Sequence, residues 1–186
     1  VGSEMCIRDR RIRPILALAA CEAEGGQLEA AMPVAMAVEL FHNFTLMHDD
    51  IMDEAPLRRG RPTVHNKWSE NVAILSGDVM YTLAMTALEG TPPSALKEVL
   101  RQFNETSKEV CEGQQSDMAF EVRDNVTVDE YLKMIRLKTS VLLAASAAMG
   151  ASAAGASSER VEAWYQYGVN VGLAFQIQDD FLDTFG

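Results

Sequence analysis

Two segments of the chain, residues 49–53 and 179–183, carry the same pattern of aspartates, Asp-Asp-x-x-Asp. Residues four apart lie one turn apart on the same face of an α-helix, so the first and last aspartates of each segment should point the same way. Carboxylates held this close repel one another, and each raises the pKa of the other unless a cation lies between them. Mg²⁺ prefers such oxygen ligands and usually binds one or two carboxylates together with water and substrate phosphate. The candidate metal ligands are therefore Asp49, Asp50, Asp53, Asp179, Asp180 and Asp183.

One acidic segment alone would be as compatible with a solvated helix face as with a metal site. Two copies, each at the end of an apolar helix, favour the metal site. A basic segment, residues 57–62 (Leu-Arg-Arg-Gly-Arg-Pro), follows the first copy, and Arg58 lies five positions after Asp53. Guanidinium groups form forked, charge-assisted hydrogen bonds to phosphate. A basic surface loop is the alternative, but the neighbouring carboxylates favour binding of a metal-bound diphosphate.

Further candidates are single residues in apolar surroundings. Lys138 lies beside Thr139 in an otherwise apolar helix, where a lysine could also simply extend its charged end to solvent. Gln176 lies three residues before the second acidic segment, on the same expected helix face. His42 lies seven residues, or two turns, before the first acidic segment. A structural glutamine and a core histidine are the alternatives, and for His42 the surrounding pattern favours ligand binding.

Helices are expected to position all of these residues. Apolar residues recur at three- to four-residue spacing along the chain, whereas no alternating pattern of useful strand length occurs. Ser69 is a candidate N-cap, and Thr127 with Glu130 forms a candidate capping box. The fold class is therefore all-α. The expected helices span residues 14–24, 28–54, 67–88, 94–120, 127–153 and 159–186, with a basic loop over 55–66.

The composition fits one globular domain. The chain has 186 residues, of which 48% are hydrophobic, and a net charge of −11, which argues against binding to nucleic acid or to an anionic membrane surface. No segment reaches the ~20 consecutive uncharged apolar residues of a membrane span. The cysteines at positions 6, 21 and 111 have no metal-binding spacing, so we expect free thiols and a reducing compartment, the cytoplasm.

Residues 1–10 differ in character from the rest and resemble translated sequencing-adapter read-through. We therefore interpret them as non-native and assign residues 11–186 to one domain. Because the chain stops just after the second acidic segment, we expect this domain to be incomplete at both ends.

The motifs together resemble those of a known enzyme family. Residues 39–53, which read Glu-Leu-Phe-His-Asn-Phe-Thr-Leu-Met-His-Asp-Asp-Ile-Met-Asp, followed by Arg58-Arg59-Gly60, resemble the first aspartate-rich region of polyprenyl diphosphate synthases. Residues 172–183, Gly-Leu-Ala-Phe-Gln-Ile-Gln-Asp-Asp-Phe-Leu-Asp, are similar to their second region. The pairs Gly77-Asp78, Gly113-Gln114 and Lys138-Thr139 also occur in the expected order, so that the resemblance extends over about residues 11–186.

The resemblance implies an isoprenoid synthase-type helical bundle around a central cavity. It further implies a magnesium-dependent prenyltransferase with three metal ions per active site. In its reaction an allylic diphosphate ionises, isopentenyl diphosphate attacks the allylic cation, and loss of a proton gives a longer prenyl diphosphate. A product of farnesyl or geranylgeranyl length (C15 to C20) and a homodimer, formed through Ala- and Met-rich faces of central helices, are also implied.

The resemblance assigns roles residue by residue. The catalytic residues it implies are Asp49, Asp53, Asp179, Lys138, Thr139 and Gln176, the last three as diphosphate- and cation-stabilising groups, and the substrate-binding residues are Arg13, His42, Arg58, Arg59, Lys138, Gln176 and Phe44. Of these, Arg13, His42 and Arg59 map to the isopentenyl diphosphate site. The chain departs from the family at Arg10, which stands where the family usually has a ligand lysine.

Phe44 lies five residues before Asp49 and should project near the same helix face, a little over one turn away. A large, rigid ring at that position could form the floor of the cavity and limit the product length. Ordinary core packing is the alternative. The resemblance favours the floor, because a bulky aromatic residue at this position generally marks the short-chain synthases.

Two other functions fit the same residues less well. A terpene cyclase of the same fold usually carries a different second metal motif, whereas this chain has a complete second Asp-Asp-x-x-Asp and Arg58-Arg59-Gly60. A non-catalytic partner subunit of a prenyl synthase would be expected to have lost one acidic segment, and both are intact here.

Overall fold

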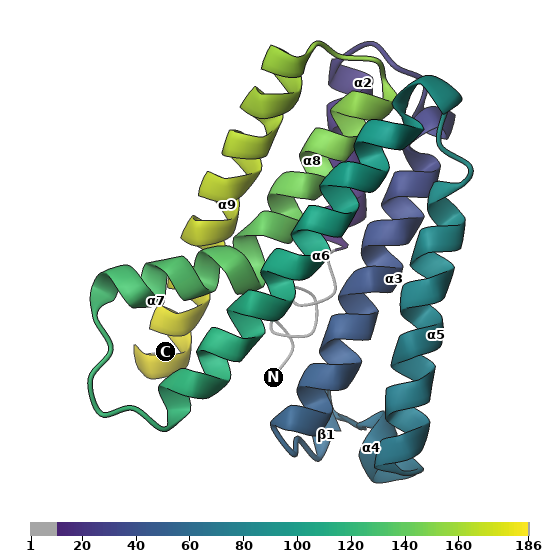
Figure 1. The fold of residues 1–186 in the computed structure, drawn as a ribbon. Helices are drawn as coiled ribbons and strands as arrows, with labels where there is room; N and C mark the ends of the chain where they lie inside the picture. Colours follow the sequence, from purple (N-terminus) through teal and green to yellow (C-terminus); the bar gives the residue numbers. More distant parts are fainter. Residues whose placement is uncertain (1–10, 186) are drawn as a thin grey trace.

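The computed structural model describes residues 11–185, and within that range helices dominate. The interpretation of residues 1–10 as non-native, and the replacement of a ligand lysine by Arg10, lie outside the described residues. The long helices run side by side in a bundle, and the C-terminal end of the chain lies close to α7 (Figure 1). The helices are α2 (Ile12–Ala23), α3 (Leu28–Met52), α4 (Val64–Lys67), α5 (Glu70–Leu88), α6 (Pro93–Glu121), α7 (Val128–Ile135), the π-helical turn η1 (Arg136–Ser140), α8 (Val141–Ala153) and α9 (Ser158–Phe185).

Capping residues explain where two of these helices begin. The Ser69 side chain accepts a hydrogen bond from the backbone N–H of Val72, so α5 begins at Glu70 rather than at the expected residue 67. The predicted capping box is confirmed at α7: Thr127 Oγ1 accepts from the Glu130 N–H, and the Glu130 carboxylate accepts from the Thr127 N–H.

The expected basic loop contains a small β-hairpin. Strand β1 (Leu57–Arg58) pairs antiparallel with β2 (Arg61–Pro62). The turn residues Arg59 and Gly60 have φ angles of 53° and 73°, and positive φ at both central positions is what a two-residue type I′ turn requires. Strands of two residues are too short to show an alternating pattern, and the fold is all-α as expected.

Helix α8 is the centre of the bundle. Each of its residues is buried, and it packs against α2, α3, α6 and α9. Its alanines and Gly150 let the neighbouring helices approach closely: a Cβ on Gly150 would lie 2.0 Å from the carbonyl oxygen of Ala17. Helix α8 is thus the innermost of the described helices.

The expected helix over residues 127–153 is divided by the π-helical turn η1 between α7 and α8. Glycines on two neighbouring helices press against this turn. A Cβ on Gly113 of α6 would lie 2.3 Å from the backbone nitrogen of Lys138, and one on Gly172 of α9 would lie 2.6 Å from Ser140 Cα. The turn is therefore clamped from both sides, and α7 leaves it to run across the bundle (Figure 1).

Three helical stretches among the described residues, Leu28–Met52, Glu70–Leu88 and Val128–Ala153, are long and apolar enough to cross a membrane by length and composition alone. The expectation from the sequence concerned an uncharged run of apolar residues, whereas mean hydropathy over a window tolerates isolated charges, so the two criteria differ. The last stretch is enclosed in the bundle, where 83% of its apolar window is buried.

Candidate active site

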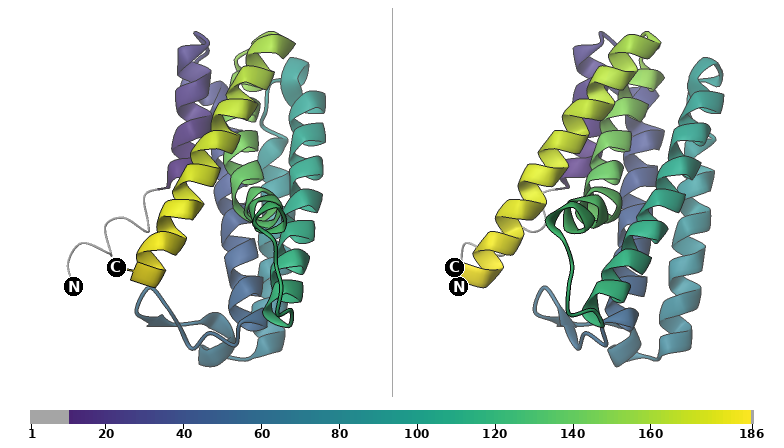
Figure 2. Two further views of the ribbon diagram at one scale, coloured as in Figure 1. Left: turned by 90° about the vertical axis from the view of Figure 1, so that its left-hand side faces the viewer. Right: turned by 60° about the vertical axis from the view of Figure 1, so that its left-hand side comes forward.

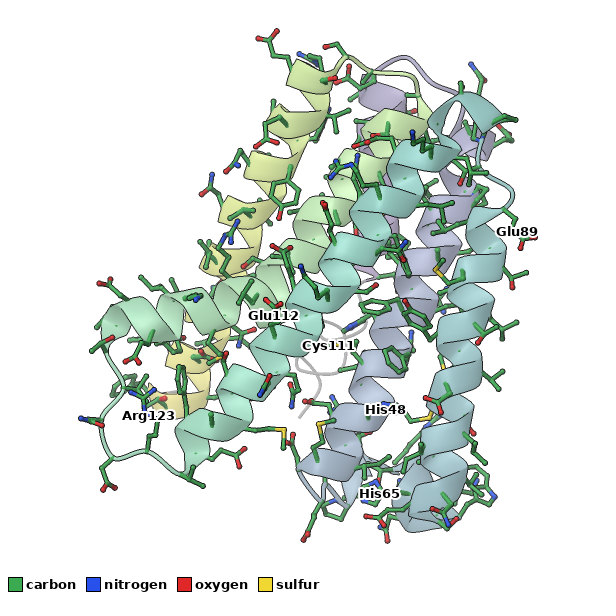
Figure 3. The ribbon with its side chains drawn as sticks, viewed as in Figure 1. His48, His65, Glu89, Cys111, Glu112 and Arg123 are labelled. Atoms are coloured by element: carbon green, nitrogen blue, oxygen red, sulfur yellow. The ribbon has the colours of Figure 1, made fainter. Side chains whose placement is uncertain are left out.

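The two acidic segments lie toward the same end of the bundle, at the C-terminal ends of α3 and α9 (Figures 1 and 2). A cavity of about 300 Å³ opens beside the first segment, and its walls come from α2, α3, α6, η1 and α8. Six residues predicted from the sequence line it: Arg13, His42, Phe44, Asp49, Lys138 and Thr139. Its remaining wall is mostly apolar, and Cys111 of α6 and His48 of α3, both labelled in Figure 3, also line it.

Arg58 lies against the first acidic segment. The hairpin turns it back toward α3, where its Nε donates to Asp50 Oδ1 at 2.6 Å and its Nη2 lies 3.5 Å from Asp49 Oδ2. Asp50 is 6% exposed, and this ion pair compensates the burial of its carboxylate. The predicted proximity of the guanidinium and the first two aspartates is therefore present.

Lys138 lies between two carboxylates. Its Nζ donates to Asp117 Oδ2 at 2.6 Å and lies 3.4 Å from Asp49 Oδ1. Burial lowers the pKa of Lys138, but the hydrogen bond to Asp117 and the charge of Asp49 outweigh it, so the pKa is raised overall and the ammonium stays charged. Sequence reasoning missed Asp117, although Asp117 lies one turn after Gly113, in a segment already singled out.

The first acidic segment suits a cation. Asp49 Oδ1 is buried and takes part in no hydrogen bond. Burial raises the pKa of Asp53, and the charge of Asp49 raises it further, against the opposing effect of the Lys138 ammonium. A divalent cation would bind Asp49 Oδ1 and lower the pKa of Asp53, so these donors fit Mg²⁺. Within residues 11–185, no group of three or more His, Cys, Asp or Glu side chains is already arranged as a metal site.

Arg13 and His42 form a second polar pair at the cavity. Arg13 Nη1 lies 3.2 Å from His42 Nε2. Burial lowers the pKa of His42 to about 2, assisted by the positive charges of Arg13, Arg59 and Arg58. The histidine is therefore uncharged and accepts the hydrogen bond, which leaves the other guanidinium nitrogens available to an anion.

Thr139 connects the cavity wall to α9. Its Oγ1 donates to Gln176 Oε1 at 3.0 Å, and Gln176 Nε2 donates to Asp180 Oδ1 at 2.7 Å. The Tyr131 hydroxyl of α7 donates to Asp180 Oδ2. Burial and the adjacent Asp180 carboxylate raise the pKa of Tyr131 to about 12, so the phenol is a donor at neutral pH. Tyr131 was not predicted, since it is distant in sequence from both acidic segments.

The second acidic segment does not line this cavity. Asp179 is half-buried and Asp183 is exposed on α9, which packs on α8, η1 and α7. Since α8 also packs on α3, the two acidic helices are joined through α8, and α9 diverges from α3 toward its C-terminal end (Figure 2). Of the two acidic segments as described, the first contributes Asp49 to the lining of this cavity and the second contributes no residue.

Phe44 belongs to an aromatic cluster on the cavity wall. Its ring centroid lies 5.5 Å from those of Phe41 and Tyr81 and 4.7 Å from that of His48. Phe44 and Cys111 also line a second cavity, of about 600 Å³, between α3, α5 and α6. These two residues are therefore part of the wall between the two cavities.

Comparison with known proteins identifies relatives over nearly the whole chain. The model of the polyprenyl synthetase family matches residues 4–186. A geranylgeranyl diphosphate synthase from Methanosarcina mazei is 49% identical over 177 residues, which cover 94% of this chain and 54% of that protein. A (2E,6E)-farnesyl diphosphate synthase from Mycobacterium tuberculosis is 45% identical, with coverage of 95% and 49%. The chain thus spans about half the length of the curated relatives it matches.

Solved structures agree with these relatives. A geranylgeranyl pyrophosphate synthetase from Geoglobus acetivorans superimposes with a TM-score of 0.91 at 43% identity, covering 94% of this chain and 57% of that one. A polyprenyl synthase from Caulobacter crescentus, complexed with calcium and isoprenyl diphosphate, gives a TM-score of 0.89 at 33% identity and covers 95% and 53%.

Proposed function

Because this chain belongs to the polyprenyl synthetase family, we propose that it forms the core of a short-chain prenyl diphosphate synthase. The enzyme condenses isopentenyl diphosphate head to tail with an allylic prenyl diphosphate and releases diphosphate. The observation that carries this proposal is the convergence of two cations, Arg58 and Lys138, on Asp49 at the mouth of an apolar cavity. This arrangement suits a substrate with a diphosphate head and a hydrocarbon tail.

The chemistry begins with cleavage of the allylic C–O bond, so that negative charge develops on the departing diphosphate. Arg58 and Lys138 already lie at the carboxylates and can exchange part of these ion pairs for phosphate oxygens. Charges fixed in place before the reaction stabilise the leaving group without further reorganisation. The apolar wall around them excludes the water that would otherwise capture the allylic cation.

Asp49 and Asp53 would hold Mg²⁺, and Asp179 and Asp183 would hold further Mg²⁺ ions. Bound Mg²⁺ supplies charge neutralisation of the departing diphosphate. The buried Oδ1 of Asp49, which has no hydrogen bond and lies 3.4 Å from the Lys138 ammonium, and the raised pKa of Asp53 support this assignment. Three ions per active site are proposed from the family resemblance. Asp50, already paired with Arg58 at 2.6 Å, would orient the guanidinium.

The remaining polar groups divide between the cation and the second substrate. Thr139 and Gln176, with Lys138, are assigned to stabilising the cation: Thr139 and Lys138 line the cavity, and Thr139 donates to Gln176 Oε1 at 3.0 Å. Arg13 and neutral His42 suit the diphosphate of isopentenyl diphosphate. Arg59 is proposed as a further ligand of that diphosphate, from its place in the hairpin turn.

Product length would follow from the depth of the apolar cavity. Phe44 stands between the cavity of about 300 Å³ and its larger neighbour, which supports its role as a floor. We propose products of farnesyl to geranylgeranyl length, the products named for the relatives from M. tuberculosis and M. mazei.

A homodimer in the cytoplasm completes the proposal. Exposed apolar residues along α5 support a partner surface. The described cysteines, Cys21 and Cys111, are free thiols, in keeping with a reducing compartment. The acidic ends of α3 and α9 would need to lie in water to bind diphosphate, which supports a protein without a membrane span.

The test is incorporation of labelled isopentenyl diphosphate by the natural full-length protein, with allylic starters of increasing length. We expect C15 to C20 diphosphates in the presence of Mg²⁺ and none after chelation. A cyclised hydrocarbon from the allylic diphosphate alone would indicate a terpene cyclase. Turnover only after addition of an active homologue would indicate a partner subunit.

A further inference from the structure

A chain of hydrogen bonds runs from α7 through α9 to the cavity wall. The Tyr131 hydroxyl donates to Asp180 Oδ2, and Gln176 Nε2 donates to Asp180 Oδ1 at 2.7 Å. Thr139 Oγ1 in turn donates to Gln176 Oε1 at 3.0 Å, and Thr139 lines the cavity. Both carboxylate oxygens of Asp180 therefore accept hydrogen bonds from protein side chains.

This chain has a direction, and the direction fixes the Gln176 amide. An ionised carboxylate only accepts hydrogen bonds, so Asp180 selects the NH₂ group of the amide and turns its oxygen toward Thr139. The Thr139 hydroxyl then donates to that oxygen, which leaves the hydroxyl lone pairs for the cavity. A cation in the cavity would meet the negative end of the hydroxyl dipole.

The reversed amide would have the same shape and the opposite electrostatics. Amide oxygen and nitrogen are nearly alike in size, so packing alone does not distinguish the two orientations. With the NH₂ group toward Thr139, the hydroxyl would accept instead of donate, and its hydrogen would turn toward the cavity. That hydrogen would repel a developing positive charge. The contact of Asp180 with Tyr131 keeps the carboxylate in the position that prevents this reversal.

We propose that Tyr131 and Asp180 are positioning residues that orient the Gln176 amide, so that the Thr139 hydroxyl presents its lone pairs to the allylic cation. The inference rests on the proposed function and deepens it. Asp180 serves the electrostatics of the cavity, whereas Asp179 beside it remains a ligand of Mg²⁺.

Steady-state kinetics of the natural full-length protein test the assignment with Tyr131→Phe and Asp180→Asn. Each variant should lower kcat by about tenfold or more, the effect of losing a hydrogen bond to a charged group. KM for both diphosphates should stay near the wild-type value, because the cation forms only after the substrates bind. Tyr167→Phe removes the same hydroxyl from an exposed position of α9 and should leave kcat unchanged.

The double variant distinguishes a common action of the two residues on kcat from independent effects. Because both residues act on one amide, Tyr131→Phe with Asp180→Asn should lower kcat no further than the more damaging single variant. Losses that multiply would contradict a common action. A wild-type kcat in both single variants would overturn the inference.

Metal binding provides a readout independent of turnover. Calorimetric titration of Mg²⁺ in the presence of inorganic pyrophosphate should give wild-type affinity for Tyr131→Phe and Asp180→Asn and weaker binding for Asp179→Asn. A loss of Mg²⁺ affinity in Asp180→Asn as large as that in Asp179→Asn would make Asp180 a metal ligand and overturn the inference. No product from the unmodified protein would overturn the proposed function and the inference with it, whereas normal turnover in wild type and both variants would overturn the inference alone.

Discussion

His42 is a base held uncharged by its surroundings. Burial and the positive charges of Arg13, Arg59 and Arg58 lower its pKa to about 2, and its Nε2 faces Arg13 Nη1 at 3.2 Å. A protonated imidazole there would repel the guanidinium, whereas the neutral ring orients it. The histidine thus helps the protein keep a cluster of arginines together before a diphosphate arrives.

The neutral state of His42 makes stability depend on pH. In the unfolded chain the imidazole takes up a proton as pH falls through about 6.5, but in the folded protein it stays neutral until pH is near 2. The unfolded state binds more protons between these values, so the free energy of unfolding should fall with decreasing pH, by up to about 1.4 kcal/mol per pH unit from this group. Urea denaturation at several pH values should show a shallower dependence for His42→Gln. An unchanged slope in His42→Gln would contradict the assignment.

Phe44 separates two cavities, which leads to a prediction about product length. Phe44→Ala removes the ring from the wall between the cavities of about 300 and 600 Å³ and should let the growing chain pass. Chromatography of the products should show longer prenyl chains at similar total incorporation. Phe120→Ala removes the same aromatic ring at a residue that lines neither cavity, so it should leave the product distribution unchanged. If Phe44→Ala also gives the wild-type distribution, the stop lies elsewhere, at Met80, at Met85 or across a dimer interface.

At the level of the elements, the π-helical turn η1 determines where Lys138 and Thr139 point. The extra residue of a π turn rotates the side chains that follow, and such turns often occur at functional sites. Gly113 lets α6 approach this turn so closely that a Cβ on Gly113 would lie 2.3 Å from the backbone nitrogen of Lys138. The same approach brings Asp117, one turn later on α6, within 2.6 Å of the Lys138 ammonium.

Gly113→Ala should therefore damage the site through the backbone. The new methyl group has no space and must push α6 from η1, which should lower the free energy of unfolding by about 1–3 kcal/mol. Because Lys138 moves with the turn, turnover should fall by more than the loss of folded protein explains. Thermal unfolding and single-turnover kinetics measure the two effects. Ala119→Ser adds one atom to an exposed position of α6 and should change neither, and wild-type turnover in Gly113→Ala would contradict the close approach.

At the level of the whole molecule, the sequence was sufficient to predict the structure wherever local patterns determine it. Helical periodicity predicted the bundle, and the cap at Ser69 and the capping box at Thr127 lie where expected. The hairpin at residues 57–62 was missed because a two-residue turn sets it, and the π turn was missed because contacts with other helices set it. Neither depends on periodicity.

The same division holds for the site. His42, Asp49 and Lys138 were predicted from motifs and line one cavity. Asp117 and Tyr131 were not, because each acts through a partner far away in sequence, Lys138 and Asp180 respectively. A pairing across helices depends on how the helices pack, and one sequence alone does not contain that information.

The outer face of α5 leads to a prediction about assembly. Leu75, Val79 and Leu83, spaced four residues apart, are 65%, 57% and 48% exposed and form an apolar stripe along that helix. The Ala-rich α8 is buried throughout, so it does not contribute to the outer surface of the described bundle. A second copy seated on the stripe of α5 would remove this apolar surface from water.

Leu75→Glu combined with Val79→Glu should dissociate the proposed homodimer. Two carboxylates buried against an apolar partner surface would each cost several kcal/mol, enough to outweigh association at micromolar concentration. The isolated bundle should be unaffected, because both side chains are exposed on it. Sedimentation velocity of the natural full-length protein should give a dimer for wild type and a monomer for the double variant, with unchanged circular dichroism. Val128→Glu, a comparable change at a residue of α7 that is 72% exposed, should remain dimeric. A dimer that survives both charges would place the interface on another helix, and a monomeric wild type would remove the dimer altogether.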